Sequence, residues 1–182
     1  MARSVRWFGL LVLAAALPTL AACDGPPPKP AGFNNRIAVN TAKWSSAVAA
    51  LRKAIEPLSS NQDVPAATVQ GAYDQLVKEF KEVKSTSRHM PVPAGSSAGQ
   101  TYRDKYWEFL DGQEDLLNNE VKRIVTAAGD TKLKPYDRWR VILGIFAEIE
   151  KKERPARDAL QKAQGEFNSA HKLTAQMPPP SK

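Results

Sequence analysis

Apolar side chains between residues 34 and 174 recur every three or four positions, which is the spacing of one face of an α-helix. Polar or proline-containing segments divide this pattern into four runs. The runs are Ile37, Trp44, Val48, Leu51, Ile55 and Leu58; Val69, Tyr73, Leu76, Phe80 and Val83; Tyr102, Tyr106, Phe109, Leu110, Leu116, Leu117, Val121 and Ile124; and Trp139, Ile142, Phe146, Ile149, Ala156, Leu160, Ala163, Phe167 and Ala170. No segment alternates apolar and polar residues for long enough to predict a strand, so we expect an all-α fold.

Residues that typically start or end helices separate the four runs. They are Asn34 or Asn35 as the first N-cap, Pro57 at the end of the first helix, Pro65 in the first turn of the second, Gly129 after the third and Pro135 at the start of the fourth. The longest connection is a loop predicted over residues 85–97. Helices joined in this way favour an antiparallel up-down-up-down four-helix bundle over residues 34–174.

Two polar residues interrupt the apolar runs. Glu153 falls on the stripe of the fourth helix, and Pro155 follows it inside the same helix, where a proline tends to produce a kink. Gln113 lies between apolar neighbours of the third helix in the same way. Three interpretations stay open: a polar layer or pocket where a ligand binds, a polar pair that sets the register of the bundle, or a stripe that drifts to the surface as the helix bends.

Proline-rich segments flank the helical region. Residues 24–32 read DGPPPKPAG, and the C-terminus from Gln176 reads QMPPPSK. Such sequences favour extended polyproline geometry, at about 3.1 Å per residue, and do not pack into a core. We therefore expect a stiff, disordered tether over residues 23–33 and a disordered tail over residues 175–182.

The first 22 residues have the three parts of an export signal. Arg3 and Arg6 form a basic start, residues 7–17 form an apolar core, and Ala21 and Ala22 provide small residues at the end. The apolar core is shorter than the roughly 20 residues that a membrane-spanning helix needs. Cys23, the only cysteine of the chain, follows directly.

The residues Leu20-Ala21-Ala22-Cys23 resemble the lipobox of bacterial lipoproteins. The resemblance covers residues 1–23 only, and no family is recognised for the rest of the chain. It implies that a diacylglyceryl group is joined to the Cys23 sulfur and that residues 1–22 are then removed. In many members the new amino group is also acylated, with a chain such as palmitate. Two or three acyl chains would anchor the protein at a bilayer, whereas one gives only reversible binding.

The same resemblance implies a location. The protein would be lipid-anchored at a cell membrane and would face the periplasm or the outside of the cell. Asp24 resembles the signal that keeps enterobacterial lipoproteins at the inner membrane, but this rule differs between bacteria. The choice between inner and outer membrane therefore stays open.

The side-chain charge of the exported part is basic. Removing Arg3 and Arg6 leaves 24 lysines and arginines against 19 acids, a balance of +5. A basic domain near a membrane suits anionic head groups or a cell-wall polymer, while export argues against nucleic acid as a partner. The charges are interleaved along the chain, which predicts a mixed, solvated surface.

The sequence offers little for catalysis or cofactor binding. Residues 95–99 (GSSAG) match the spelling of a serine-hydrolase elbow, but that motif needs a preceding strand and a histidine base. Covalent haem needs C-x-x-C-H, and di-iron bundles need Glu-x-x-His pairs; the sequence contains neither. His89 and His171 are expected to be solvated. We predict no catalytic residue, no metal and no cofactor.

Aromatic residues crowd the start of the third helix. Trp107 is predicted to point away from the face that carries the apolar run, with Arg103 one turn before it. The pair marks either ordinary packing or a contact surface for an envelope protein or cell-wall component. The leading hypothesis is thus a non-catalytic helical interaction or scaffold module. The alternative is a carrier with a small-ligand cavity inside the bundle, near Glu153 and Gln113.

Overall fold

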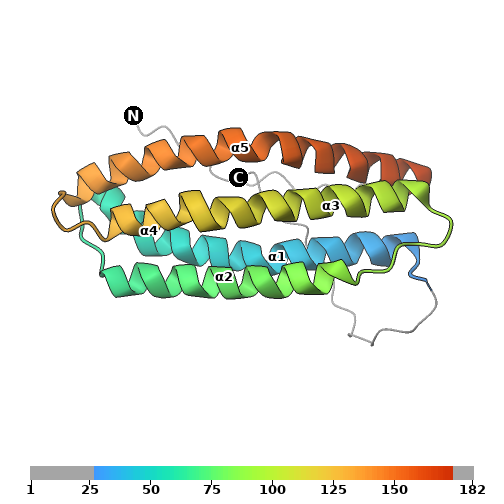
Figure 1. The fold of residues 1–182 in the computed structure, drawn as a ribbon, viewed down its shortest axis with the longest axis horizontal. Helices are drawn as coiled ribbons and strands as arrows, with labels where there is room; N and C mark the ends of the chain where they lie inside the picture. Colours follow the sequence, from blue (N-terminus) through green and yellow to red (C-terminus); the bar gives the residue numbers. More distant parts are fainter. Residues whose placement is uncertain (1–26, 174–182) are drawn as a thin grey trace.

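The computed structural model describes residues 27–173, and every regular element within this range is helical. Figure 1 shows that these helices lie side by side along a common long axis. The elements are α1 (Pro30–Ile55), η1 (Glu56–Ser60), α2 (Ala66–Arg88), α3 (Ser97–Leu116), η2 (Leu117–Val121), α4 (Lys122–Ala128) and α5 (Pro135–Ala170). The predicted all-α class is confirmed. The export signal, Cys23 and the tail over 175–182 lie outside the described residues.

The third rod consists of three consecutive elements. The α3 helix passes without a break into a π-helical turn, η2, and then into α4. The α1 helix packs mainly along α2, and α3 packs mainly along α5. The long α5 therefore spans the whole length of the α3–η2–α4 rod (Figure 1).

The first helix begins earlier than the sequence pattern predicts. It starts at Pro30, after an extended Lys29, so the expected N-cap at Asn34 or Asn35 is wrong. Proline is well suited to the first position of a helix because the N–H that it lacks would have no partner there. Residues 30–33, predicted as tether, are helical, and Phe33 packs edge to face against Tyr102 and Phe167. Asn34 accepts hydrogen bonds from the side chains of Tyr102 and Gln164 instead of capping the helix.

The end of α1 is close to its expected position, whereas α2 is longer than expected. The α1 helix ends at Ile55, and η1 then carries the chain through Pro57, close to where the sequence predicts the stop. The α2 helix continues to Arg88, so the loop predicted over 85–97 shortens to residues 89–96. Buried Ser87 explains the extension: its hydroxyl accepts from Asn40 Nδ2 at 3.1 Å, and its carbonyl accepts from Trp107 Nε1 at 3.1 Å.

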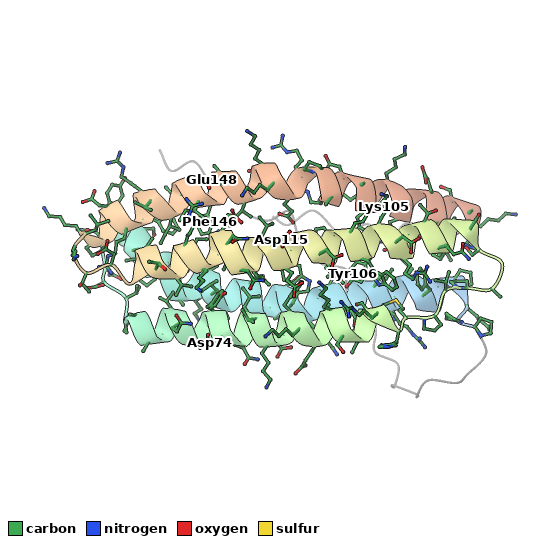
Figure 2. The ribbon with its side chains drawn as sticks, in the orientation of Figure 1. Asp74, Lys105, Tyr106, Asp115, Phe146 and Glu148 are labelled. Atoms are coloured by element: carbon green, nitrogen blue, oxygen red, sulfur yellow. The ribbon has the colours of Figure 1, made fainter. Side chains whose placement is uncertain are left out.

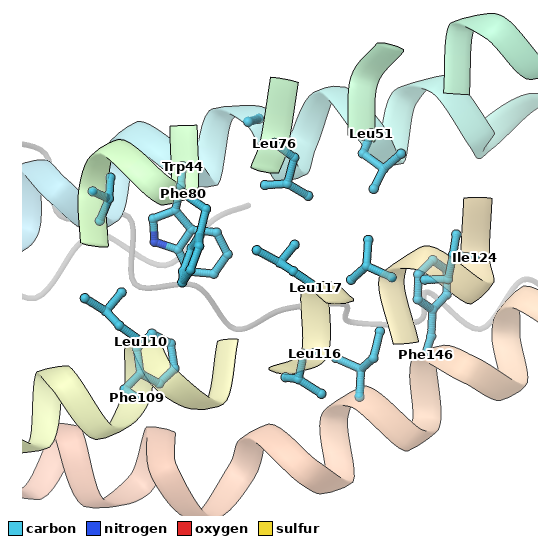
Figure 3. Close-up of a cluster of buried hydrophobic side chains, with 14 of the residues drawn as sticks. Trp44, Leu51, Leu76, Phe80, Phe109, Leu110, Leu116, Leu117, Ile124 and Phe146 are labelled. Carbon is cyan, nitrogen blue, oxygen red and sulfur yellow. The ribbon is translucent and has the colours of Figure 1, made fainter. Parts of the chain in front are cut away.

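The core is apolar and continuous along the bundle. Figure 3 shows side chains from α1, α2, the third rod and α5 pointing into one shared interior. Trp44 and Phe80 meet there edge to face, with ring centroids 5.8 Å apart. Figure 2 shows the contrast with the outside, where charged residues such as Asp74, Asp115 and Glu148 are exposed. Burial of each large apolar side chain contributes roughly 1.5–3 kcal/mol, so this core stabilises the domain without disulfides.

A buried arginine joins three segments at one end of the bundle. Arg138, in the first turns of α5, is only 2% exposed. Its Nη1 donates to the Ala128 carbonyl at the end of α4, and its Nη2 donates to Asp63 Oδ1, both at 2.7 Å. The guanidinium thus joins the start of α5, the end of α4 and the segment before α2. No apolar run or motif in the sequence marks Arg138 as buried.

Candidate functional site: a polar groove between α3 and α5

The two polar residues that interrupt the apolar runs lie in one place. Glu153 of α5 and Gln113 of α3 are 5% and 3% exposed, and both line a groove of about 460 Å³. Glu120, which is 4% exposed, lines the same groove and was not anticipated from the sequence. The other lining residues are Phe109, Gly112, Asp115, Leu116, Asn119, Lys152 and Ala156.

Both helices that form the groove are irregular beside it. In the third rod, η2 is a π-helical turn, which widens the helix locally and shifts the positions that face the core. Leu117, Glu120 and Val121 all become buried in this turn. In α5, Pro155 lacks the N–H that would bond to the Lys151 carbonyl. The departure from regular helix on both walls is consistent with the opening between them.

The groove holds two buried carboxylates with different partners. Glu120 Oε1 lies 2.5 Å from Lys152 Nζ, which forms an ion pair from the exposed side of α5. The ion pair of Glu153 is longer, with 3.9 Å between its Oε2 and Arg157 Nη1. Burial raises the pKa of Glu153, while the charge of Arg157 and a hydrogen bond from Gln113 act in the opposite direction. This chemistry suits a cationic or hydrogen-bonding group.

We expect Glu153→Gln to stabilise the domain at neutral pH. The raised pKa means that the folded state binds the Glu153 proton more tightly than the unfolded state does. Wild-type stability therefore falls as pH rises from the ordinary glutamate pKa of 4.5 through the raised value, and the loss persists above it. Glutamine cannot ionise, so this loss disappears. The measurement is the free energy of unfolding by denaturant at several pH values.

The matched control is Glu166→Gln, which alters an exposed carboxylate on the same helix. We expect the advantage of Glu153→Gln over this control at neutral pH to vanish below the ordinary glutamate pKa. A Glu153→Gln variant less stable than wild type at neutral pH would mean that the contact with Arg157 outweighs the cost of burial.

Trp107 and Arg103, the predicted partner surface, contact each other away from the groove lining. The Trp107 ring is partly buried against the core, and its Nε1 donates to the Ser87 carbonyl. The side chain is therefore less exposed than predicted. The Arg103 guanidinium carbon lies 5.0 Å from the centre of the Trp107 ring and also bonds to Asp104. This cation–π arrangement leaves a half-exposed aromatic and cationic patch.

The exposed large apolar side chains of the described region lie elsewhere. They are Leu133, Tyr136 and Val141, and Tyr136 is 52% exposed. They come from the connection between α4 and α5 and from the first turns of α5. None of these three residues belongs to the predicted apolar runs, because each lies outside the helix face that packs into the core.

The segment GSSAG is the start of a helix. Ser96 is the N-cap of α3, and its Oγ accepts from the Gly99 N–H at 2.9 Å. Glycine is needed at position 99, because a Cβ there would lie 2.8 Å from Val92 and 2.9 Å from Ser96 Oγ. Ser96 Oγ also lies 2.7 Å from His171 Nε2. His171, predicted to be solvated, is thus only partly exposed and hydrogen-bonded, whereas His89 is exposed as predicted.

Two kinds of feature are absent from residues 27–173. No group of three His, Cys, Asp or Glu side chains within residues 27–173 is arranged as it would be around a metal ion. Among the helices of this range, none has both the length and the apolarity that a bilayer crossing requires. Comparison of the chain with protein-family models, curated protein sequences and solved structures found no match.

Proposed function

We propose that this chain is an envelope lipoprotein, anchored to a membrane through acylated Cys23, whose helical domain is a non-catalytic interaction or scaffold module. The observation that carries the proposal is the series of basic start, short apolar core and Leu20-Ala21-Ala22-Cys23. The domain faces the periplasm or the exterior, and its partner is an envelope protein or a cell-wall component.

The start of α1 supports this proposal. Helix begins at Pro30, seven residues after Cys23, and the intervening segment contains Pro26, Pro27 and Pro28. At about 3.1 Å per residue, an extended spacer of this length reaches roughly 22 Å. We take the domain to be an antiparallel up-down-up-down bundle. Figure 1 supports this topology, because the connections between successive rods lie at alternate ends of the bundle. A short spacer then keeps one end of the bundle close to the bilayer.

Crosslinking in cells tests the interaction module. A photo-crosslinking amino acid is placed at Arg103, at Tyr136 or, as a control, at Lys162, an exposed residue outside both patches. We expect a specific adduct from Arg103 or Tyr136, because aromatic and arginine side chains are enriched where proteins bind one another. Adducts are detected by gel shift and identified by mass spectrometry. The absence of a specific adduct at both positions would argue against the module.

The groove supports a second candidate function, a carrier for a small ligand. Its volume of about 460 Å³ falls within the range of about 300–1,000 Å³ that small-molecule sites occupy. The groove also contains Glu153 and Gln113, the two residues that the sequence predicts as a polar layer. The buried carboxylates of Glu120 and Glu153 favour a ligand with a cationic group.

Filling the groove separates the carrier from the interaction module. A Cβ added at Gly112, which lines the groove, would meet no atom within 4 Å, and the same holds for Gly144, which lies outside the groove. If the domain is a carrier, native mass spectrometry of protein from cells will show a bound mass that Gly112→Leu removes and Gly144→Leu retains. A wild-type protein without bound mass would contradict the carrier.

A further inference from the structure

Helix α1 carries charge of a single sign. Its 26 residues contain Arg36, Lys43, Arg52 and Lys53 and no acid. All four cations are exposed. Within residues 27–173, none of them forms an ion pair or a side-chain hydrogen bond, although eleven such ion pairs occur elsewhere in this range. We call these four residues the α1 basic face.

Helix α3 carries the opposite charge. It has five acids, Asp104, Glu108, Asp111, Glu114 and Asp115, against Arg103 and Lys105. The buried sides of the two helices face each other across the core, where the rings of Phe33 and Tyr102 lie 5.9 Å apart. Their exposed sides therefore point in opposite directions. The bundle has a basic side along α1 and an acidic side along α3.

The α1 basic face suits a flat anionic surface. Its charges are spread along the helix from Arg36 to Lys53, and exposed Ala49 and Ala50 add little bulk between them. At about 1.5 Å per residue, the cations extend over roughly 25 Å. At about 3.6 residues per turn the four charges are also distributed around the whole exposed half of α1, and charge spread in this way fits many head groups better than it fits one small anion.

We propose that the α1 basic face lies on the anionic phospholipid head groups of the membrane that holds Cys23. The inference rests on the proposed lipid anchor, because α1 begins only seven residues after Cys23 and its basic face is thereby kept within reach of the head groups. The bundle then lies along the membrane, and the acidic side of α3 is presented away from it. A partner arriving from the aqueous side meets α3, including Trp107.

The first test maps lysine accessibility on the mature, acylated protein. The protein is reconstituted on vesicles of phosphatidylcholine, with or without phosphatidylglycerol, and treated with a soluble amine-acylating reagent. Labelling of Lys105 and Lys162 should be the same on both vesicle types, whereas labelling of Lys43 and Lys53 should be at least about threefold lower on the anionic vesicles. Molar salt, which shortens the screening length to about 3 Å, should restore their labelling.

The second test does not depend on the anchor. Binding of the full chain carrying Cys23→Ser to the anionic vesicles is compared with that of the same chain carrying Gln at all four positions of the α1 basic face. Each cation near an anionic surface contributes about fivefold in binding, so we expect a loss of about 100-fold or more. The matched control replaces Lys78, Lys81, Arg140 and Lys151, all exposed on other helices, with Gln. It changes the net charge equally and should lose only a few-fold.

The outcomes separate the two proposals. Protein that floats with neutral vesicles but shows equal lysine labelling on both vesicle types keeps the anchor and overturns the inference. Protein that fails to float with neutral vesicles refutes the anchor. The inference is then decided by the two quadruple variants alone. Equal losses of vesicle binding in the α1 variant and the control variant would overturn it. Protection of Lys43 and Lys53 without vesicles, increasing with protein concentration, would also overturn it, because a second copy's α3 would then be the occupant.

Discussion

Replacing Cys23 by serine should move the protein from the membrane fraction to the soluble fraction. The serine hydroxyl cannot form the thioether that the lipobox resemblance implies, so the diacylglyceryl group is not attached and residues 1–22 are not removed at this site. Each buried methylene contributes about 0.8 kcal/mol, so the loss of two or three acyl chains removes the part of the membrane affinity that resists alkaline extraction. The measurement is fractionation with alkaline extraction, followed by immunoblotting.

Thr19→Ser is the matched control, because it makes an equally conservative change within the same export signal. It should leave both the membrane extraction and the size of the processed protein unchanged. Cys23→Ser protein that is still processed to the wild-type size and still resists extraction would contradict the lipid anchor.

The largest effect on stability is expected from Arg138→Ala, which should lower the free energy of unfolding by about 2–4 kcal/mol. The substitution leaves the Ala128 carbonyl without its 2.7 Å partner and opens a void where the guanidinium and its stem were buried. Both effects are costly in a packed interior. The control is Arg140→Ala, an exposed position two residues later, which should change stability by less than about 0.5 kcal/mol.

Acid unfolding provides a second measurement on the same variants. The hydrogen bond from Arg138 lowers the pKa of Asp63 below its ordinary value of 3.8. A lowered pKa adds stability above the unfolded value, and this contribution is lost as pH falls through the folded value. The free energy of unfolding of Arg138→Ala should therefore fall less steeply with decreasing pH than that of the wild type. Stability equal to that of Arg140→Ala at neutral pH would show that the guanidinium does not hold this end of the bundle together.

The apolar runs predicted the core well because helix periodicity and burial express the same geometry. Trp44, Leu76, Phe80 and Ile142 all lie on a predicted stripe and are all buried. Phe33 was missed because it follows a proline-rich segment that predicts an extended chain. The structure uses Pro30 as a helix start instead, and the Phe33 ring then packs on residues from α3 and α5. No local pattern encodes that contact.

The candidate site was predictable only in part. Glu153 and Gln113 were evident as polar positions on apolar stripes, whereas Glu120 was not, because the stripe passes through Leu117 and Val121. The π-helical turn adds Glu120 to the buried side, and this turn has no marker such as a proline. Arg138 was missed for a related reason. Its partners, Asp63 and the Ala128 carbonyl, come from other elements, so its burial depends on tertiary structure.

Mass spectrometry of the mature protein, purified from its natural membrane, is the most direct test of the account. The N-terminal peptide should begin at Cys23 and carry the added mass of a diacylglyceryl group, with or without a further acyl chain on the amino group. A peptide with a free Cys23 thiol, or a mature chain that begins after Cys23, would contradict the lipid anchor and with it the proposed location at the envelope.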